Sequence, residues 1–380
     1  MVSNNTSHCF ISWSWIEGGS TTAKDEYCRS LAKYGHSVTL IARGHGDSYE
    51  PQVNLKIIPV NDARPDSEKI SHISFYFRVI KHLYENKYDF VDIFISPGIS
   101  IFPIVLFFKK TKWVMHLRSS AVQGGVSAVI RNLLRRIESM FFNYIAVIDR
   151  GIAHNMYFSK AKIASMAEFP CGVNKDLFNL VEVHDESILN LIKEKTVFTY
   201  VGKLDKSRCG VNLIDAYKLV VDKCKDTMLF VVGDGDDLDE MKNKAKELGI
   251  ADIISFVGRV PYTEVPVYLS VTDIALSYIP VTVMYDHQPP LKVLEYLQYK
   301  IPQVATKTSA TRKYIKHEIN GLIASDKVDE YALQMIRLAN DKNLYESIKN
   351  RLNDQSIDYS WDTVVKDKLI PFYDEKLQMN

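Results

Sequence analysis

The sequence is poor in cysteine, and its few thiols follow no binding pattern. Its five cysteines are odd in number, scattered and never spaced as C-x-x-C: Cys9, Cys28, Cys171, Cys209 and Cys224. A disulfide framework is built from an even, closely spaced set, and a structural zinc site from paired thiols. Disulfide bonds and a structural zinc site are therefore both disfavoured, and the thiols indicate a reduced, cytosolic compartment.

An excess of charge of one sign is also absent. Lys and Arg number 47 and Asp and Glu number 46, so the net charge is +1. Proteins that hold nucleic acid through its phosphates usually carry a basic excess. We therefore expect no nucleic-acid partner.

Long hydrophobic runs are missing as well. The longest, residues 99–108, contains Ser100 and Pro103 and falls short of the ~20 residues that a membrane-spanning helix needs. The first eight residues are polar and lack the charged-then-apolar pattern of a secretory signal. We expect a cytoplasmic protein, with any membrane contact being peripheral.

What the sequence has is a globular composition and two series of alternating elements. Of its 380 residues, 46% are hydrophobic and 24% are charged, and at roughly 150 residues per domain this length gives two domains. The expected strands, most of them continuous apolar runs, lie at 10–13, 38–42, 55–60, 90–96, 112–117, 144–148, 197–202, 228–233, 253–258, 273–279, 303–306 and 322–325. Such runs are typical of strands buried on both faces of a parallel sheet. Amphipathic segments between them, such as 22–34, 211–223, 238–248 and 290–299, predict an α/β fold of doubly wound sheets.

The linker between the two series is expected in residues 171–192, where glycine, asparagine and aspartate cluster ahead of an acidic stretch. We therefore expect one domain over 1–180 and a second over 181–357. The remaining segment, 358–380, contains a helix with an apolar face formed by Trp361, Val364, Val365, Leu369, Phe372 and Tyr373.

Candidate binding residues follow the expected strands, because ligands of open parallel sheets bind at the carboxyl ends of strands. Gly18 and Gly19 follow the first strand, where paired glycines let the backbone approach a phosphate or sugar oxygen. A plain strand-to-helix turn explains them as well, and the dinucleotide pattern G-x-G-x-x-G is absent. His116 ends a later strand and is either structural or catalytic.

A cationic loop follows the strand at 197–202. Lys203, Lys206 and Arg208 lie within six residues, between a strand end and a helix start. A lysine supplies a point charge and an arginine a bidentate fork for a diphosphate leaving group. A solvated loop is the alternative. The nearby turn at 233–237 is interpreted as structural, because its aspartates would repel a phosphate.

The most informative stretch is 285–296, where Pro289 and Pro290 open a helix. Lys292 and Glu295 are three residues apart and share one helical face near that start. The carboxylate can accept two ribose hydroxyl groups, while Lys292 and the exposed N–H groups can face phosphates. The alternative is an ordinary surface Lys–Glu pair.

Taken in order, these motifs resemble the GT-B retaining glycosyltransferases, specifically glycosyltransferase family 4. The matching pieces are Glu17-Gly18-Gly19, residues 35–39, His116, residues 172–178, residues 201–210, residues 232–235, residues 256–258 and residues 290–295. The resemblance implies two Rossmann-like parallel-sheet domains facing a cleft. It assigns the acceptor to 1–180, the nucleotide-sugar to 181–357 and a helix returning to the first domain to 358–380.

The resemblance also implies roles for single residues. Lys203 and Arg208 correspond to the basic pair on the diphosphate, His116 to a histidine near the reacting sugar, and Glu295 to the ribose-binding carboxylate. The rest of the implied donor site is Gly18, Gly19, Gly258, Asp286, His287, Gln288, Leu291 and Lys292. Two departures stand out: His287 occupies the place of the family's first motif glutamate, and Cys209 follows Arg208 where glycine is commoner.

The implied activity is sugar transfer with retained anomeric configuration, from a UDP- or GDP-sugar and without a metal or other cofactor. The acceptor would be a glycan, a lipid-linked sugar or a small molecule. Rival interpretations are a nucleotide-sugar epimerase or phosphorylase on the same fold, a two-Rossmann dehydrogenase, and a non-catalytic partner subunit.

Two apolar segments carry cations that would suit a membrane surface. Residues 99–108 are followed by Lys109, Lys110 and Lys112, and the expected helix at 126–142 carries three arginines. Core elements with a cationic rim are the alternative interpretation.

Overall fold

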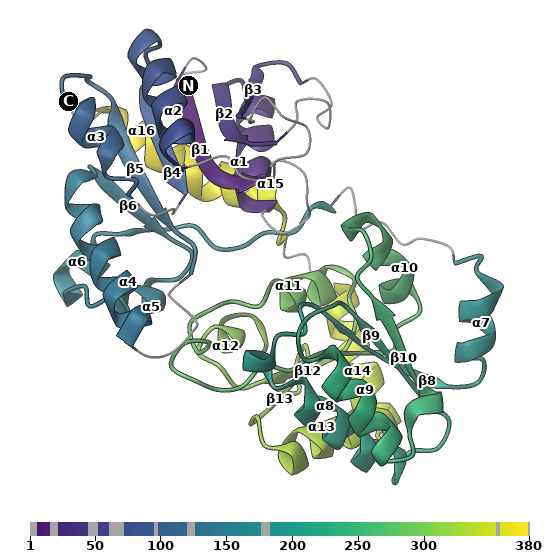
Figure 1. The fold of residues 1–380 in the computed structure, drawn as a ribbon. Helices are drawn as coiled ribbons and strands as arrows, with labels where there is room; N and C mark the ends of the chain where they lie inside the picture. The colour runs from purple at the N-terminus through teal and green to yellow at the C-terminus, as the bar shows by residue number, and fades with distance from the viewer. Residues whose placement is uncertain are drawn as a thin grey trace. The chain divides into compact units, whose positions relative to one another are not determined.

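The computed structural model describes residues 6–15, 22–44, 52–60, 72–94, 98–119, 126–175, 183–354 and 358–378. The chain forms two compact units, one comprising Met1–Gly172 with Ser360–Asn380 and the other Val173–Tyr359 (Figure 1). The units divide after Gly172, inside the stretch 171–192 in which the linker is expected and eight residues ahead of the expected boundary after residue 180. That stretch runs into helix α7 (Glu186–Ile192) of the second unit.

The first unit is built on a parallel sheet with strand order β3-β2-β1-β4-β5-β6-β7. Its strands are β1 (Ser7–Trp15), β2 (Ser37–Arg43), β3 (Leu55–Val60), β4 (Phe90–Phe94), β5 (Lys112–Leu117), β6 (Tyr144–Val147) and β7 (Ala167–Glu168). The first six were expected from their apolar runs. β7 was not, because two residues are too short to leave a pattern.

Helices cover both faces of this sheet. Helix α1 (Thr22–Lys33) packs on one face, where Tyr27 and Leu31 join a buried cluster with residues of the C-terminal helix. The other face is covered by α2 (His72–Glu85), α3 (Ile101–Val105), α5 (Arg150–His154) and α6 (Lys160–Ala164), which share a second buried cluster. Helix α4 (Val126–Glu138) and the turn Ser139–Phe141 connect β5 to β6.

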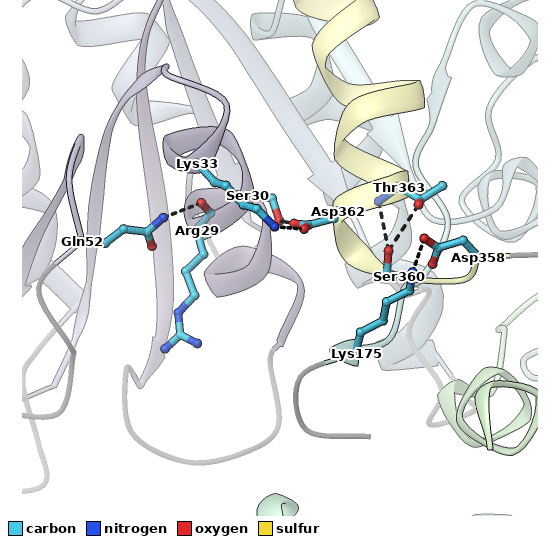
Figure 2. Close-up of polar contacts among 9 residues, drawn as sticks. All are labelled: Arg29, Ser30, Lys33, Gln52, Lys175, Asp358, Ser360, Asp362 and Thr363. Atoms are coloured by element: carbon cyan, nitrogen blue, oxygen red, sulfur yellow. Dashed lines mark hydrogen bonds and ion pairs between the residues drawn. The ribbon is translucent and has the colours of Figure 1, made fainter. Parts of the chain in front are cut away.

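The C-terminal helix returns to the first unit, as expected. It runs through α15 (Trp361–Val364), a π-helical turn (Val365–Leu369) and α16 (Ile370–Gln378). Pro371 explains the irregular turn, because proline lacks the N–H that an α-helix would use four residues back. Figure 2 shows how the helix is tied to α1: Ser30 Oγ donates to Asp362 Oδ1 at 2.6 Å, and Lys33 pairs with the same carboxylate.

The two chain segments that join the units are fixed by close local contacts. Ser360 caps α15, accepting a hydrogen bond from Thr363 N at 3.2 Å (Figure 2). Gly172 faces Trp361 so closely that a Cβ atom would lie 2.7 Å from Trp361 N. In the second unit Val173 N donates to Tyr359 O at 2.9 Å, beside the Lys175–Asp358 ion pair.

The second unit is a six-stranded parallel sheet with strand order β10-β9-β8-β11-β12-β13. Its strands are β8 (Thr196–Val201), β9 (Thr227–Val232), β10 (Ile254–Gly258), β11 (Ile274–Ser277), β12 (Gln303–Thr306) and β13 (Leu322–Ala324), all at expected places. Beyond α7, its helices are α8 (Gly210–Val221), α9 (Leu238–Glu247), α10 (Val265–Ser270), α11 (Leu291–Gln298), α12 (Thr311–Tyr314), α13 (Val328–Asn340) and α14 (Lys342–Asp354). Among the described parts of the chain, no helix combines the length and apolarity needed to cross a bilayer.

Candidate functional site

The carboxyl ends of three neighbouring strands in the second unit meet through glycines. Gly202, Gly233 and Gly258 follow or end β8, β9 and β10, with φ of 145°, 149° and 82°. Gly202 N donates to Val232 O at 2.9 Å, and Gly233 N to Gly258 O at 2.8 Å. A Cβ atom on Gly233 would lie 1.8 Å from Gly202 O, whereas one on Gly258 would meet open space. The strand ends therefore form a backbone edge with few side chains, the kind of surface a ligand can approach closely.

The cationic loop after β8 is held by the acidic turn that follows β9. Lys206 N donates to Asp236 Oδ1 at 2.9 Å, and Gly210 N, at the start of α8, donates to Asp237 Oδ2 at 2.7 Å. A Cβ atom on Gly235 would lie 2.3 Å from Leu204 O, so only glycine fits there. The structural interpretation of this turn agrees with these contacts, because Asp236 and Asp237 each accept a backbone hydrogen bond from the loop or the start of α8.

The loop then turns sharply at Cys209. This residue has φ of 51° and ψ of 51°, the left-handed conformation in which glycine is favoured. The departure seen in the sequence, a cysteine where glycine is commoner, therefore falls at the position where the backbone favours glycine.

Lys292 is buried at the beginning of α11, with its side chain against Tyr200. The side chain is 5% exposed, and Nζ lies 3.4 Å from the centre of the Tyr200 ring. Across the residues the structure describes, Lys292 Nζ finds no hydrogen-bond partner. Burial lowers the pKa of Lys292 well below its usual value of 10.5, the nearby Arg208 lowers it further, and Glu295 opposes the shift. Such an ammonium group is poised for an anion that would replace its lost hydration.

Arg208 approaches the same tyrosine from the cationic loop. Burial raises the pKa of the Tyr200 hydroxyl, and the charge of Arg208 and its hydrogen bond to the hydroxyl oppose that rise. Arg208 Cζ also lies 5.9 Å from the centre of the Tyr285 ring. Tyr200 thus brings together Arg208 and Lys292, two cations that the sequence analysis predicted from separate motifs.

Glu295 lies one turn further along α11 and is 4% exposed. Its Oε1 accepts a hydrogen bond from the Tyr262 hydroxyl at 2.7 Å. Burial raises the pKa of Glu295, while the Tyr262 hydrogen bond and the charge of Lys292 oppose the rise. The Lys292–Glu295 pair is therefore buried, unlike the surface pair that was its alternative interpretation.

The segment before α11 is anchored on both sides. Tyr285 Oη and Ser207 Oγ are 2.8 Å apart, which links it to the cationic loop. Asp286 accepts hydrogen bonds from Ser309 N at 2.7 Å and Ser309 Oγ at 2.6 Å. Burial favours the protonated form of Asp286, but the hydrogen bonds from Ser309 and the charge of His287 prevail and lower its pKa. The carboxylate of Asp286 is thereby committed to fixing this loop.

The remaining residues of the segment lie around the start of α11. His287, Gln288 and Leu291 are half-buried, and His287 Nε2 lies 3.5 Å from Asp286 Oδ2. Helix α11 begins at Leu291 with Pro290 as its N-cap, one position earlier than the first-turn proline expected. Among the described residues no side chain caps this helix. Val293 N donates to Pro290 O at 3.1 Å, which leaves the N–H groups of Leu291 and Lys292 for a ligand.

Lys203 is placed differently from the other cations. Its side chain is 67% exposed, and Nζ forms an ion pair with Asp205 Oδ1 at 2.8 Å. The structure therefore brings together Arg208, Lys292 and Glu295, and leaves Lys203 on the outer part of the loop.

His116 lies in the interior of the first unit. It is 1% exposed, and its Nε2 is 2.7 Å from Asp92 Oδ1, which also accepts a hydrogen bond from the Tyr373 hydroxyl at 2.8 Å. The imidazole stacks on Phe94 with a ring separation of 4.7 Å. These contacts join β4, β5 and the C-terminal helix, and they are sufficient to explain the residue structurally.

Two predicted residues, Gly18 and Gly19, lie outside the described residues. Within the described ranges, no group of three or more His, Cys, Asp or Glu side chains is arranged to hold a metal ion. Sequence reasoning missed Tyr200 and Tyr262, because a tyrosine inside a strand or after one carries no signal of its own.

Comparison with known proteins matches most of the second unit to a known family. Residues 183–354 match the family described as Glycosyl transferases group 1. One curated relative is the UDP-Gal:alpha-D-GlcNAc-diphosphoundecaprenol alpha-1,3-galactosyltransferase of Escherichia coli, 24% identical over 172 residues, which are 44% of this chain and 43% of that protein. The chain spans about half the length of the curated relatives it matches, from 43% to 48%.

Solved structures resemble the whole chain. Sucrose-phosphate synthase from Thermosynechococcus elongatus aligns with a TM-score of 0.76 and 17% identity, covering 99% of this chain and 100% of the other. Anabaena HepE in complex with UDP and glucose aligns with a TM-score of 0.74 and 13% identity, covering 98% and 99%. At such low identity these similarities establish the fold: the chain has the GT-B fold, with two Rossmann-like parallel-sheet domains and a C-terminal helix.

Proposed function

We propose that this chain, whose residues 183–354 form a domain of the Glycosyl transferases group 1 family, transfers a sugar from a nucleotide-diphosphate-sugar to an acceptor. The observation that carries the proposal is the buried Lys292 ammonium. Within the described residues it lacks a hydrogen-bond partner. Arg208 from the loop after β8 and Glu295 from the next turn of α11 lie beside it. A cation in this position is stabilised by a bound anion.

The diphosphate fits the cationic side of this site. Lys292 and Arg208 approach Tyr200 from α11 and from the loop after β8, and the uncapped start of α11 supplies backbone N–H groups. A diphosphate gains negative charge as the sugar bond breaks, so fixed cations stabilise the transition state more than the ground state. Lys203 can join them, because an exposed ion pair such as Lys203–Asp205 is worth only about 0–1 kcal/mol and exchanges readily for a phosphate.

The nucleoside fits the other side. Glu295 is buried, and a carboxylate at this depth can accept both ribose hydroxyl groups while Tyr262 orients it. Gly258 ends the adjacent strand with open space where a side chain would lie, which suits a base packed against backbone. We further propose transfer with retained configuration and without a metal, as the resemblance to glycosyltransferase family 4 implies.

Donor and acceptor classes follow from the relatives. The Anabaena HepE structure contains UDP and glucose, and the name of the Escherichia coli relative specifies UDP-Gal and a diphosphoundecaprenol-linked acceptor. We propose a UDP-sugar donor for this chain and a lipid-linked sugar as the first acceptor to test.

The proposal is tested by nucleoside diphosphate release and product analysis, with UDP- and GDP-sugars and with or without acceptor. We expect Glu295→Ala and Lys203→Ala each to lose most transfer while the circular dichroism spectrum is unchanged. The exposed pair Lys327–Glu330 at the start of α13, 3.0 Å apart with the same spacing in sequence, supplies matched controls, and Lys327→Ala and Glu330→Ala should retain transfer.

Transfer at the wild-type rate in Glu295→Ala would refute the site. An altered sugar released without acceptor would instead identify an epimerase on the same fold.

A further inference from the structure

Helix α4 of the first unit exposes its apolar face to solvent. Its buried side chains are Ala128 and Asn132. The large apolar side chains on the helix and in the turn that follows it are exposed, from 44% to 78%: Val126, Val129, Ile130, Leu133, Leu134, Ile137, Met140 and Phe141. An amphipathic helix on a globular domain normally buries its apolar stripe, so this arrangement requires an explanation.

Hydrogen bonds on the polar side hold the helix in this orientation. Asn132 Nδ2 donates to Asn155 O at 3.0 Å, and Arg135 Nη1 donates to Ser119 O at 3.1 Å. The Glu138 carboxylate accepts backbone hydrogen bonds from residues 98–100, just ahead of α3. Turning the apolar stripe inward would break all of these contacts.

The apolar surface continues over the neighbouring helices. Glu138 links α4 to α3, and the rings of Tyr84 on α2 and Phe108 after α3 are 6.1 Å apart. Sixteen of the 24 large hydrophobic side chains that are exposed in the described residues lie on α2, α3, α4 or the turns that follow α3 and α4. On α2 and α3 they are Ile73, Phe77, Tyr84, Ile101, Ile104, Val105, Phe107 and Phe108. We call these sixteen residues the apolar surface.

Cations border this surface. Residues 72–141 contain ten Lys and Arg but four Asp and Glu, whereas the whole chain is nearly balanced at 47 and 46. Of the four acids Asp92 is buried, and Asp89 and Glu138 accept hydrogen bonds from Ser7 and from backbone. Exposed Arg131 and Arg136 stand two residues before and three residues after Leu133, which at about 100° per residue places them on opposite sides of the apolar stripe of α4.

A hollow of about 610 Å³ opens beside Tyr84 and Phe108. Lys87, Lys109 and Lys110 line it, so cations also gather at the α2–α3 end of the apolar surface.

We propose that the apolar surface and its cationic border bind the interface of an anionic lipid bilayer. The apolar side chains match the acyl chains of such an interface, and the flanking Lys and Arg match its anionic headgroups. A second copy of this chain fits less well, because a symmetric contact would bring together two surfaces that both carry an excess of cations. The inference rests on the first unit alone and does not depend on the proposed transfer reaction.

Vesicle co-sedimentation of the full chain tests the proposal without any substrate. We expect binding to vesicles containing about one-third phosphatidylglycerol in phosphatidylcholine, and several-fold weaker binding to phosphatidylcholine alone. Ile130→Glu combined with Leu133→Glu should weaken binding at least about tenfold, since each change removes an exposed apolar group that would enter the bilayer and adds a charge that anionic lipids repel. Arg131→Gln with Arg136→Gln should weaken it severalfold and only on the anionic vesicles.

The matched control carries the same two changes on exposed apolar residues of the second unit. Leu189→Glu with Leu333→Glu, at residues 42% and 58% exposed, should bind as the wild type does. Equal binding by the control and the Ile130–Leu133 variant, with both folded by circular dichroism, would overturn the proposal. So would a dimer in sedimentation velocity that the Ile130–Leu133 variant abolishes, because the surface would then be an interface between copies.

Discussion

Lys292 Nζ lies over the centre of the Tyr200 ring at 3.4 Å, and Arg208 hydrogen-bonds the hydroxyl of the same tyrosine. Tyr200 stands near the end of β8, so one strand fixes the relative positions of a lysine from α11 and an arginine from the loop after β8. The sequence separates these cations by 84 residues, and the tyrosine brings them together. This arrangement holds two positive charges close together before any ligand arrives, which is electrostatically unfavourable and therefore informative about function.

The strain on Lys292 should appear as instability of the unliganded protein. Burying a charged group costs several kcal/mol of hydration, while a cation–π contact returns about 2 kcal/mol. Lys292→Met should therefore stabilise the unliganded protein by about 1 kcal/mol or more, raising the melting temperature by about 2–4 °C per kcal/mol. The pKa of Lys292 is lowered on folding, so this gain is present at neutral pH and disappears as pH rises past 10.5, its unfolded value. Scanning calorimetry at several pH values measures it, and a lower melting temperature for Lys292→Met at pH 7 would contradict this account.

The glycine edge makes a second prediction about stability. Gly233→Ala places a methyl group 1.8 Å from the carbonyl oxygen of Gly202, and the φ of 149° also disfavours a side chain, so β8 and β9 must separate. We expect a loss of at least about 2 kcal/mol in the free energy of unfolding. Gly249→Ala is the control, because its φ of 67° carries strain but its surroundings are open, and it should lose only about 1 kcal/mol. The losses are measured by urea titration. Equal losses in the two variants would show that the close contact between Gly233 and Gly202 does not add to the cost of the substitution.

The Asp92 cluster should stabilise the first unit. Tyr373→Phe removes a hydroxyl group that donates to the buried Asp92 carboxylate at 2.8 Å, and a hydrogen bond to a charged group contributes about 1.5–3 kcal/mol. Thermal unfolding should show that loss, whereas transfer at a temperature below unfolding should be close to wild type.

The same assay separates the two roles considered for His116. We expect His116→Gln to behave as Tyr373→Phe does, with lower stability and retained transfer. A folded, undiminished melting transition with lost transfer would instead make His116 part of the reaction.

The sequence predicts the parallel sheets well because each strand corresponds to a short local run of mostly apolar residues. Twelve of the thirteen strands in the described parts of the chain coincide with expected strands, most of which are continuous apolar runs, and the exception, β7, has two residues. That Lys292 and Glu295 share one helix was also predictable from the local sequence, because their spacing and the preceding prolines indicate it. Contacts between distant segments were not predictable: nothing near Tyr262 in the sequence points to Glu295, and nothing near His116 points to Tyr373.

Helix α4 shows a different limit. The sequence predicted an apolar-faced helix over residues 126–142 but could not say which face would be buried, and the usual assumption puts the apolar face inside. Asn132, Arg135 and Glu138 reverse it by hydrogen bonding to loops and helix ends elsewhere in the unit. Only the structure could supply those partners.

The central claim is that Lys292, Arg208 and Glu295 together bind a ribose diphosphate. Isothermal titration calorimetry of UDP, GDP and ADP into the wild type and Lys292→Ala, with Lys327→Ala as the exposed control, tests it most directly. We predict that one of these nucleotides binds the wild type and Lys327→Ala alike, and that Lys292→Ala weakens its binding at least tenfold, since a charge-assisted hydrogen bond is worth about 1.5–3 kcal/mol. The same dissociation constant for Lys292→Ala and the wild type, or no binding of any of the three to the wild type, would contradict the claim.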